Sequence, residues 1–112
     1  MEIAVDKIGE VAVVAVPVEE LDAGNTAEFK RDMSPVLEDN TKIVLDLSKV
    51  RFLDSSGLGS FLSCLRKLNS KGGDLKLCGM SPQVRMVIEL VRMHRIFDIY
   101  RTKEEAVRAF QA

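Results

Sequence analysis

The sequence predicts an α/β fold: one domain with a mixed, mostly parallel β-sheet, an antiparallel hairpin at its start and about four flanking helices. Two observations favour this class. Short apolar segments of strand length alternate with segments of helical period, which is typical of parallel strands joined by right-handed crossovers. The chain has 112 residues, 46% hydrophobic and 29% charged, which suits a globular domain with one core. We therefore expect residues 1–112 to form a single domain.

The first two strands are predicted at residues 3–5 and 11–16, on either side of a polar turn that contains Lys7 and Gly9. Two apolar runs around a short turn with glycine are typical of a β-hairpin. These two strands should therefore pair antiparallel.

A helix should follow, with Asn25 or Thr26 as its amino-terminal cap. Pro35 lies inside this segment and is expected to bend the helix or end it early. The next strand, residues 43–47, is almost continuously apolar, which indicates burial on both faces of the sheet. The buried face of the helix should contain Phe29, Met33, Val36 and Leu37.

The clearest helix begins beyond Asp54 and ends at the pair Gly72-Gly73, since glycine suits the left-handed position after a helix. A further internal strand is expected at residues 75–78. The apolar residues at helical spacing in this second helix are Leu58, Phe61, Leu62, Leu65 and Leu68.

Ser81 should cap a third helix, with Pro82 at its first position. A last strand is predicted at residues 97–100, and Thr102 with Glu105 forms a capping box for a short fourth helix through Val107 and Phe110. The buried face of the third helix is expected to contain Val84, Val87, Ile88 and Val91. The methionines expected to fill the core are Met33, Met80, Met86 and Met93, although Met86 and Leu90 fall off the strongest apolar stripe.

Residues 51–59 connect the central strand to the clearest helix, at the sheet edge where open α/β folds place their sites. The first N–H groups of a helix favour an anion there. Ser55 and Ser56 are residue types that cap helices, and Gly57 and Gly59 remove side chains that would crowd an approaching molecule. This segment is therefore the candidate site.

Two catalytic interpretations of this segment lack residues that they require. A phosphate-binding loop would need a P-loop or G-x-G-x-x-G pattern, and only Gly57 and Gly59 match. A nucleophile elbow would need glycine where Asp54 stands, and His94 is the one histidine that could act as base. Two interpretations stay open: a serine that only caps the helix, and a serine that is phosphorylated at the helix start.

Residues 43–47, Val50 and the run Phe52-Leu53-Asp54-Ser55-Ser56-Gly57-Leu58-Gly59 resemble the signature of the STAS domain, in particular that of bacterial anti-sigma factor antagonists. Leu21-Asp22 followed by Asn25 resembles the short loop that the family has after its second strand. The resemblance extends from Ile3 to Phe110. One position departs: Glu19 stands where the family often has glycine.

The resemblance implies a regulatory switch of transcription and no enzyme. Family members bind an anti-sigma factor that is also a serine kinase of the histidine-kinase-like ATPase type, and this binding frees a sigma factor. The kinase then phosphorylates the antagonist, and a PP2C-type phosphatase resets it. By position, Ser56 is the phosphoacceptor and Ser55 the minor candidate. The implied partner-binding residues are Asp22, Asn25, Asp54, Ser55, Ser56, Gly57, Leu58 and Gly59. The alternative is a STAS scaffold subunit of a signalling or lipid-transport complex whose serine is not phosphorylated.

Composition argues against several other classes. Sixteen basic and seventeen acidic residues give a net charge of −1 without a basic run, so no nucleic acid partner is expected. The longest apolar stretch, residues 11–18, falls short of the ~20 residues of a membrane helix, so no membrane insertion is expected. Cys64 and Cys78 lack metal-ligand spacing and should fill a reduced core, without metal or cofactor. We expect a cytoplasmic protein that is a monomer when free.

Overall fold

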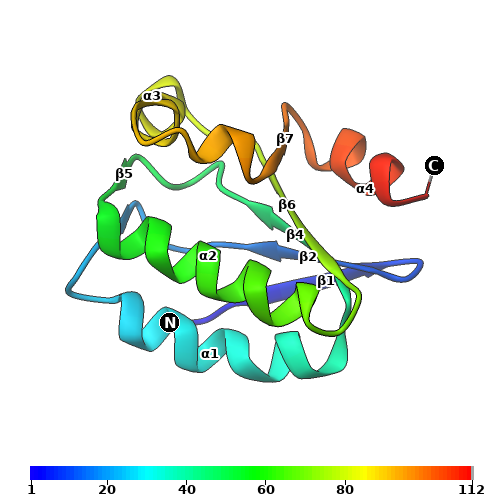
Figure 1. Ribbon diagram of the computed structural model, residues 1–112. Coiled ribbons are helices and arrows are strands. Elements are labelled where there is room, and N and C mark those ends of the chain that lie inside the picture. The colour runs from blue at the N-terminus through cyan, green and yellow to red at the C-terminus, as the bar shows by residue number, and fades with distance from the viewer. Residues whose placement is uncertain (112) are drawn as a thin grey trace.

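A computed structural model describes residues 1–111, and its sheet is flanked by helices on both faces (Figure 1). The strands β2, β4, β6 and β7 run parallel, and β1 pairs antiparallel with β2, in the order β1-β2-β4-β6-β7. The predicted fold class is therefore confirmed. The elements are β1 (Ala4–Ile8), β2 (Val11–Ala15), β3 (Glu20–Leu21), α1 (Thr26–Asp39), β4 (Lys42–Asp46), β5 (Phe52–Leu53), α2 (Ser55–Asn69), β6 (Asp74–Cys78), α3 (Pro82–Leu90), the 3-10 helix η1 (Met93–Arg95), β7 (Asp98–Tyr100) and α4 (Lys103–Gln111).

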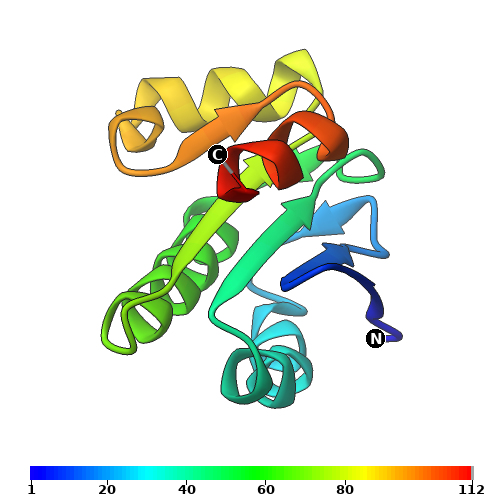
Figure 2. The same cartoon turned by 90° about the vertical axis from the view of Figure 1, so that its right-hand side faces the viewer.

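The helices divide between the two faces of the sheet. α1 and α2 pack side by side on one face, while α4 covers the other (Figures 1 and 2). The larger core lies under α1, α2 and α3 and includes Phe29 and Phe61, whose rings meet edge to face at 5.8 Å. The smaller core lies under α4 and includes Val44 and Val107. Because β4 faces both cores, its residues 43–45 are all buried, as the continuous apolar run predicted.

A second, two-stranded sheet lies beyond the carboxyl ends of the main strands and was not predicted from the sequence. Its strands, β3 and β5, pair parallel, with Glu20 opposite Phe52 and Leu21 opposite Leu53. Leu21 and Leu53 are buried, whereas Glu20 and Phe52 face solvent. This small sheet joins the segment before α1 to the segment before α2, so it positions the start of both helices.

Of the two effects predicted for Pro35, a bend or an early end, the early end is wrong, because the helix continues to Asp39. Pro35 is exposed, so the carbonyl that loses its helical N–H donor can be hydrated. Met33 and Leu37 are buried on either side of it. Their packing maintains the helix across the proline.

The hairpin turn is tighter than expected. β1 extends to Ile8, so Lys7 belongs to the strand and not to the turn. Gly9 forms the turn with a φ of +59°, a left-handed conformation that glycine adopts without strain.

The predicted capping residues Ser81 and Thr102 are confirmed, while the reciprocal Glu105 bond of the capping box is not found among residues 1–111. Ser81 accepts a hydrogen bond from the Val84 N–H at 3.2 Å, and Thr102 accepts one from the Glu105 N–H at 3.1 Å. Val91 was expected on the buried face of α3 and is exposed instead, because α3 ends at Leu90. Arg92 follows with a φ of +61°, which turns the chain into η1.

Candidate functional site

The start of α2 is capped by Asp54 and not by a serine. The Asp54 carboxylate accepts a hydrogen bond from the Gly57 N–H at 3.0 Å, which is the usual N-cap contact. Ser55 and Ser56 are the first two residues of the helix. Neither hydroxyl makes a hydrogen bond to another residue within 1–111, and Ser55 is exposed while Ser56 is half-buried. Of the two interpretations left open by the sequence, the one in which a serine caps the helix is therefore wrong.

The same aspartate ties α2 to the loop before α1. Its second carboxylate oxygen accepts a hydrogen bond from the Ala23 N–H at 3.2 Å. Asp22 closes that loop by accepting from the Gly24 N–H at 2.9 Å. The structure thus brings Asp22 and Asp54, which are 32 positions apart in the sequence, to one end of the sheet.

The Asn25 side chain stabilises the loop before α1 and does not bond to the first turn of the helix. Its side-chain oxygen accepts from the Asp22 N–H at 3.0 Å, and its amide nitrogen donates to the Glu20 carbonyl at 2.8 Å. As predicted, Asn25 occupies the N-cap position of α1, and its carbonyl accepts from the Phe29 N–H at 3.0 Å, but its side chain makes no capping hydrogen bond.

Gly57 and Leu58 belong to the inner side of the site. A Cβ at Gly57 would lie 2.5 Å from Leu53 Cδ1 and 2.7 Å from the Leu21 carbonyl oxygen, so only glycine lets α2 approach the small sheet. Leu58 is 2% exposed and packs in the larger core. These two residues hold the helix in place and leave Ser55 and Ser56 on its outer side.

Gly59 differs from Gly57, because nothing in the fold requires it. A Cβ at this exposed position would meet no atom within 4 Å, and its φ is not positive. Glycine inside a helix costs about 1 kcal/mol relative to alanine. The α2 backbone at Gly59 is therefore exposed without a side chain to cover it, one turn after the two serines.

Glu19, which stands where the family often has glycine, fits this loop without strain. Its φ is not positive, and its carbonyl accepts hydrogen bonds from the N–H groups of Arg51 and Phe52 at 2.7 and 3.0 Å. Its exposed carboxylate lies 3.7 Å from Arg51 Nε. Glu19 therefore forms a surface ion pair at a position that does not require a left-handed backbone.

An apolar patch on β5 and α3 was only hinted at by the sequence. It consists of Phe52 on β5 and of Met86 and Leu90 on α3, which are 53%, 62% and 76% exposed. β5 and α3 are in contact, and α3 lies above β5 in Figure 1. Met86 was expected in the core, and that prediction is wrong, because α3 turns only Val84 and Ile88 fully inward. Large apolar side chains gathered on a surface are typical of an interaction site.

Within residues 1–111 no group of three or more potential ligands could hold a metal ion. Burial raises the pKa of the Cys64 thiol to about 11 and that of Cys78 to about 12, so both thiols are protonated at neutral pH. No helix in the described part of the chain is long and apolar enough to cross a membrane.

Comparisons with known proteins agree with the resemblance drawn from the sequence. The family model described as the STAS domain matches residues 2–106. The chain is 30% identical over 95 residues to the anti-sigma-B factor antagonist of Staphylococcus aureus, with 84% of each chain covered. It is 35% identical over 65 residues to the anti-sigma F factor antagonist of Paenibacillus polymyxa, covering 58% of this chain and 56% of that relative. A solved anti-sigma factor antagonist from Mycobacterium paratuberculosis is 28% identical, with a TM-score of 0.89 over 99% of this chain and 94% of that one.

Proposed function

The chain belongs to the STAS domain family, and we propose that it acts as an anti-sigma factor antagonist switched by phosphorylation of Ser56. In its unphosphorylated form it binds an anti-sigma factor that is also a serine kinase of the histidine-kinase-like ATPase type, and this binding releases a sigma factor. The kinase phosphorylates Ser56, with Ser55 as the minor candidate, and a PP2C-type phosphatase removes the phosphate. The protein acts in the cytoplasm as a single STAS domain without catalytic activity of its own.

The main support for this proposal is that the residue that caps α2 is not the residue that would be phosphorylated. Asp54 takes the capping role, so the Ser56 hydroxyl is not needed to hold the helix. It makes no hydrogen bond to another residue of the described chain and is partly open to solvent. A kinase can therefore reach this hydroxyl without first unfolding the site.

A phosphate at Ser56 should leave the fold intact. The second position of a helix lies at the positive end of the helix dipole, where an anion gains about 0.3 to 1 kcal/mol. The first N–H groups of a helix also lack partners within the helix and can donate to the phosphate. The modification adds a charge of about −1.5 to −2 where the local backbone favours it.

The same phosphate should prevent partner binding. Asp54 caps the helix that begins with the serines, Asp22 lies in the loop that Asp54 contacts, and the apolar patch lies on the adjacent elements. A partner that covers this surface would have to bury the dianion without a compensating charge, at a cost of several kcal/mol. Since each 1.4 kcal/mol is a factor of ten in affinity, one phosphate can abolish binding.

Gly59 and the apolar patch extend the proposed contact surface beyond the two serines. Gly59 allows a partner to approach the α2 backbone closely, and Phe52, Met86 and Leu90 supply apolar area that folding leaves uncovered. Aliphatic and aromatic side chains of this kind form the buried centre of protein interfaces. The proposed contact surface therefore includes the starts of α1 and α2 and the outer face of α3.

The test is phosphorylation by an anti-sigma factor serine kinase from the same organism, followed by measurement of the intact mass. Wild type and Ser55→Ala should gain one phosphoryl group, and Ser56→Ala should gain none. A kinase that binds the protein and leaves its mass unchanged would support the scaffold alternative, in which the serine is not modified. A full gain on Ser56→Ala would place the phosphate elsewhere.

A further inference from the structure

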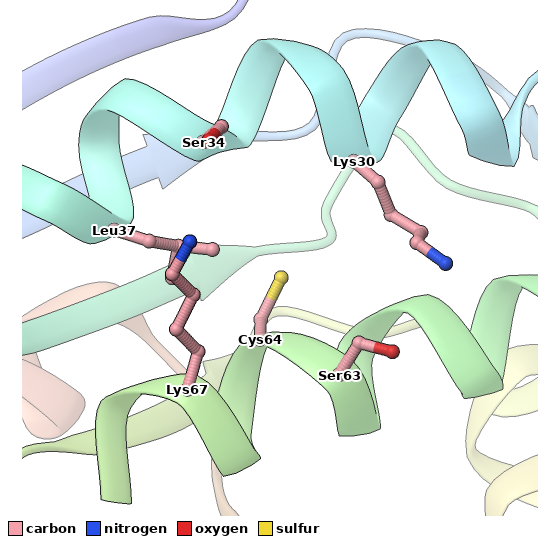
Figure 3. A pocket seen from close by; sticks show the side chains of 6 residues that line it. All are labelled: Lys30, Ser34, Leu37, Ser63, Cys64 and Lys67. Carbon is pink, nitrogen blue, oxygen red and sulfur yellow. The ribbon is translucent and has the colours of Figure 1, made fainter. Parts of the chain in front are cut away.

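A cavity of about 170 Å³ lies between α1 and α2, away from the serines (Figure 3). Both helices contribute side chains that point into the gap between them. The site described above uses the amino-terminal ends of these helices, whereas the cavity lies along their length. It is lined by Lys30, Ser34 and Leu37 of α1 and by Ser63, Cys64 and Lys67 of α2.

The cavity carries an uncompensated positive charge. Lys30 and Lys67 stand on opposite helices, and no acidic residue is part of the lining. Neither ammonium group forms an ion pair or hydrogen bond with another residue in the described part of the chain. Lys71 differs, because its ammonium group donates to the carbonyls of Leu37 and Glu38 at the end of α1.

The floor of the cavity is apolar. Leu37 and Cys64 are both buried, and the Cys64 sulfur points into the gap in Figure 3. Burial raises the pKa of this thiol to about 11, although the charges of Lys30 and Lys67 act in the opposite direction. The thiol is therefore neutral at physiological pH and behaves as a small apolar group.

The size of the cavity limits what can enter. Its volume of about 170 Å³ is below the range of pockets for drug-sized ligands, which begin at roughly 300 Å³. It has room for roughly five or six groups of the size of a water molecule, each of which occupies ~30 Å³. An unbranched chain of a few carbons with one anionic end would fill it.

We propose that this cavity binds a short aliphatic carboxylate of roughly four to six carbons. Lys30 and Lys67 flank the cavity on opposite helices, their exposed, flexible side chains turn to pair with the carboxylate, and the chain covers Leu37 and Cys64. Cations without an acidic partner beside an apolar floor match the two ends of such a ligand. This binding does not depend on the proposed function, because no residue of the serine site takes part.

The test is a titration of the ¹⁵N-labelled protein with hexanoate, followed by amide chemical shifts. Saturable shifts should appear at the middle of α1 and α2 and not at Ser55 or Ser56. Lys30→Gln and Lys67→Gln should each weaken binding by about tenfold, and Ser63→Leu, which fills the cavity from its exposed side, should abolish it. Lys49→Gln is the matched control, since Lys49 is an exposed lysine in the loop after β4.

Hexanol, which has the same chain without the charge, should bind at least tenfold more weakly than hexanoate. The proposal is overturned if hexanoate gives no saturable shifts at high millimolar concentration. It is equally overturned if the lysine variants bind as wild type does, or if hexanol binds as tightly as hexanoate. Loss of phosphorylation at Ser56 would leave all of these outcomes unchanged.

Discussion

Because Asp54 caps α2, the hydroxyl groups of Ser55 and Ser56 are not needed to stabilise the start of the helix. One carboxylate accepts hydrogen bonds from Gly57 in α2 and from Ala23 in the loop before α1. The sequence offered three adjacent residues that can cap a helix, and a capping serine was one of the two interpretations it left open. The choice depends on the position of the Ala23 N–H, which is set by pairing between β3 and β5. Local propensity cannot reveal a partner that is 31 positions away.

Asp54→Ala should lower the free energy of unfolding by about 1 to 2 kcal/mol, because the helix loses its cap and the loop loses an acceptor. Asp54→Asn, which keeps an acceptor oxygen, should lose less. Ser56→Ala should stay within about 0.5 kcal/mol of wild type, as substitutions away from such features do. Urea unfolding measures all three. An equal loss for Ser56→Ala and Asp54→Ala would mean that the serine shares the capping role.

The two glycines of α2 differ in what an added methyl group would do. Gly59→Ala should raise the free energy of unfolding by about 1 kcal/mol, since alanine favours a helix and has open space there. Gly57→Ala should lower it by about 1 to 3 kcal/mol, because its Cβ would collide with Leu53 and the Leu21 carbonyl. Thermal or urea unfolding checks both values.

The same Gly59→Ala variant separates stability from binding. If the bare backbone at Gly59 serves the approach of the anti-sigma factor, the more stable variant should bind that partner more weakly than wild type. Calorimetric titration measures the affinity. A Gly59→Ala variant that is more stable and binds as well as wild type would remove Gly59 from the contact surface.

A substitution on the outer face of α3 should weaken partner binding without changing the stability of the fold. Leu90→Ser should leave the free energy of unfolding within about 0.5 kcal/mol of wild type, because Leu90 is 76% exposed. It should weaken binding to the anti-sigma factor by roughly tenfold, through the loss of apolar contact area. Val5→Ser on β1 is the matched control, since Val5 is 45% exposed at the far edge of the sheet. Equal effects of Leu90→Ser and Val5→Ser on binding would contradict a specific role for α3.

Long elements were predictable because their apolar periodicity is repeated over several turns or residues. α2 shows this best: all five apolar positions predicted for it turn toward the interior. β3 and β5 were not predictable, because each has two residues and exists only through its pairing with the other. The burial predicted for Val91 failed for a similar reason, since the left-handed turn at Arg92 ends α3 before Val91 can face the core.

The whole molecule buries its two cysteines in different cores, Cys64 under α1 and α2 and Cys78 under α4. Burial raises the pKa of both thiols, to about 11 and about 12. In the unfolded chain a thiol titrates near pH 8.5. The folded state therefore holds these protons more tightly. The stability that this difference contributes is complete below about pH 8.5 and declines as the pH rises toward the folded pKa values.

Both thiols should consequently be protected in the native protein, Cys78 by burial and Cys64 because the cavity beside it is too small for an aromatic disulfide reagent. At pH 8 a thiol reagent such as dithiobis(nitrobenzoic acid) should react only as fast as the protein unfolds, and urea should release both cysteines together. The free energy of unfolding should fall between about pH 9 and pH 11, and less so in the Cys64→Ala, Cys78→Ala double variant. Rapid labelling of the native protein at pH 8 would contradict this account of the core.

The fold class and the position of the candidate site followed from the sequence, because strand and helix alternation fixes which loops meet at the carboxyl edge of a parallel sheet. The extent of the site could not be predicted from the sequence. Phe52 and Leu90 are 38 positions apart, and only the packing of α3 against β5 brings their elements together. A surface assembled from two exposed faces leaves no periodic pattern in either segment.

The central claim is that one phosphate on Ser56 controls partner binding, and the most direct measurement is the affinity of the anti-sigma factor for the unphosphorylated and phosphorylated forms. We expect the phosphorylated form to bind at least about 100-fold more weakly, which corresponds to ~2.8 kcal/mol, while its free energy of unfolding is unchanged. Ser56→Ala should bind as the unphosphorylated protein does, and Ser56→Asp should stay folded and bind poorly. Equal affinity of the two forms for the anti-sigma factor would contradict the switch.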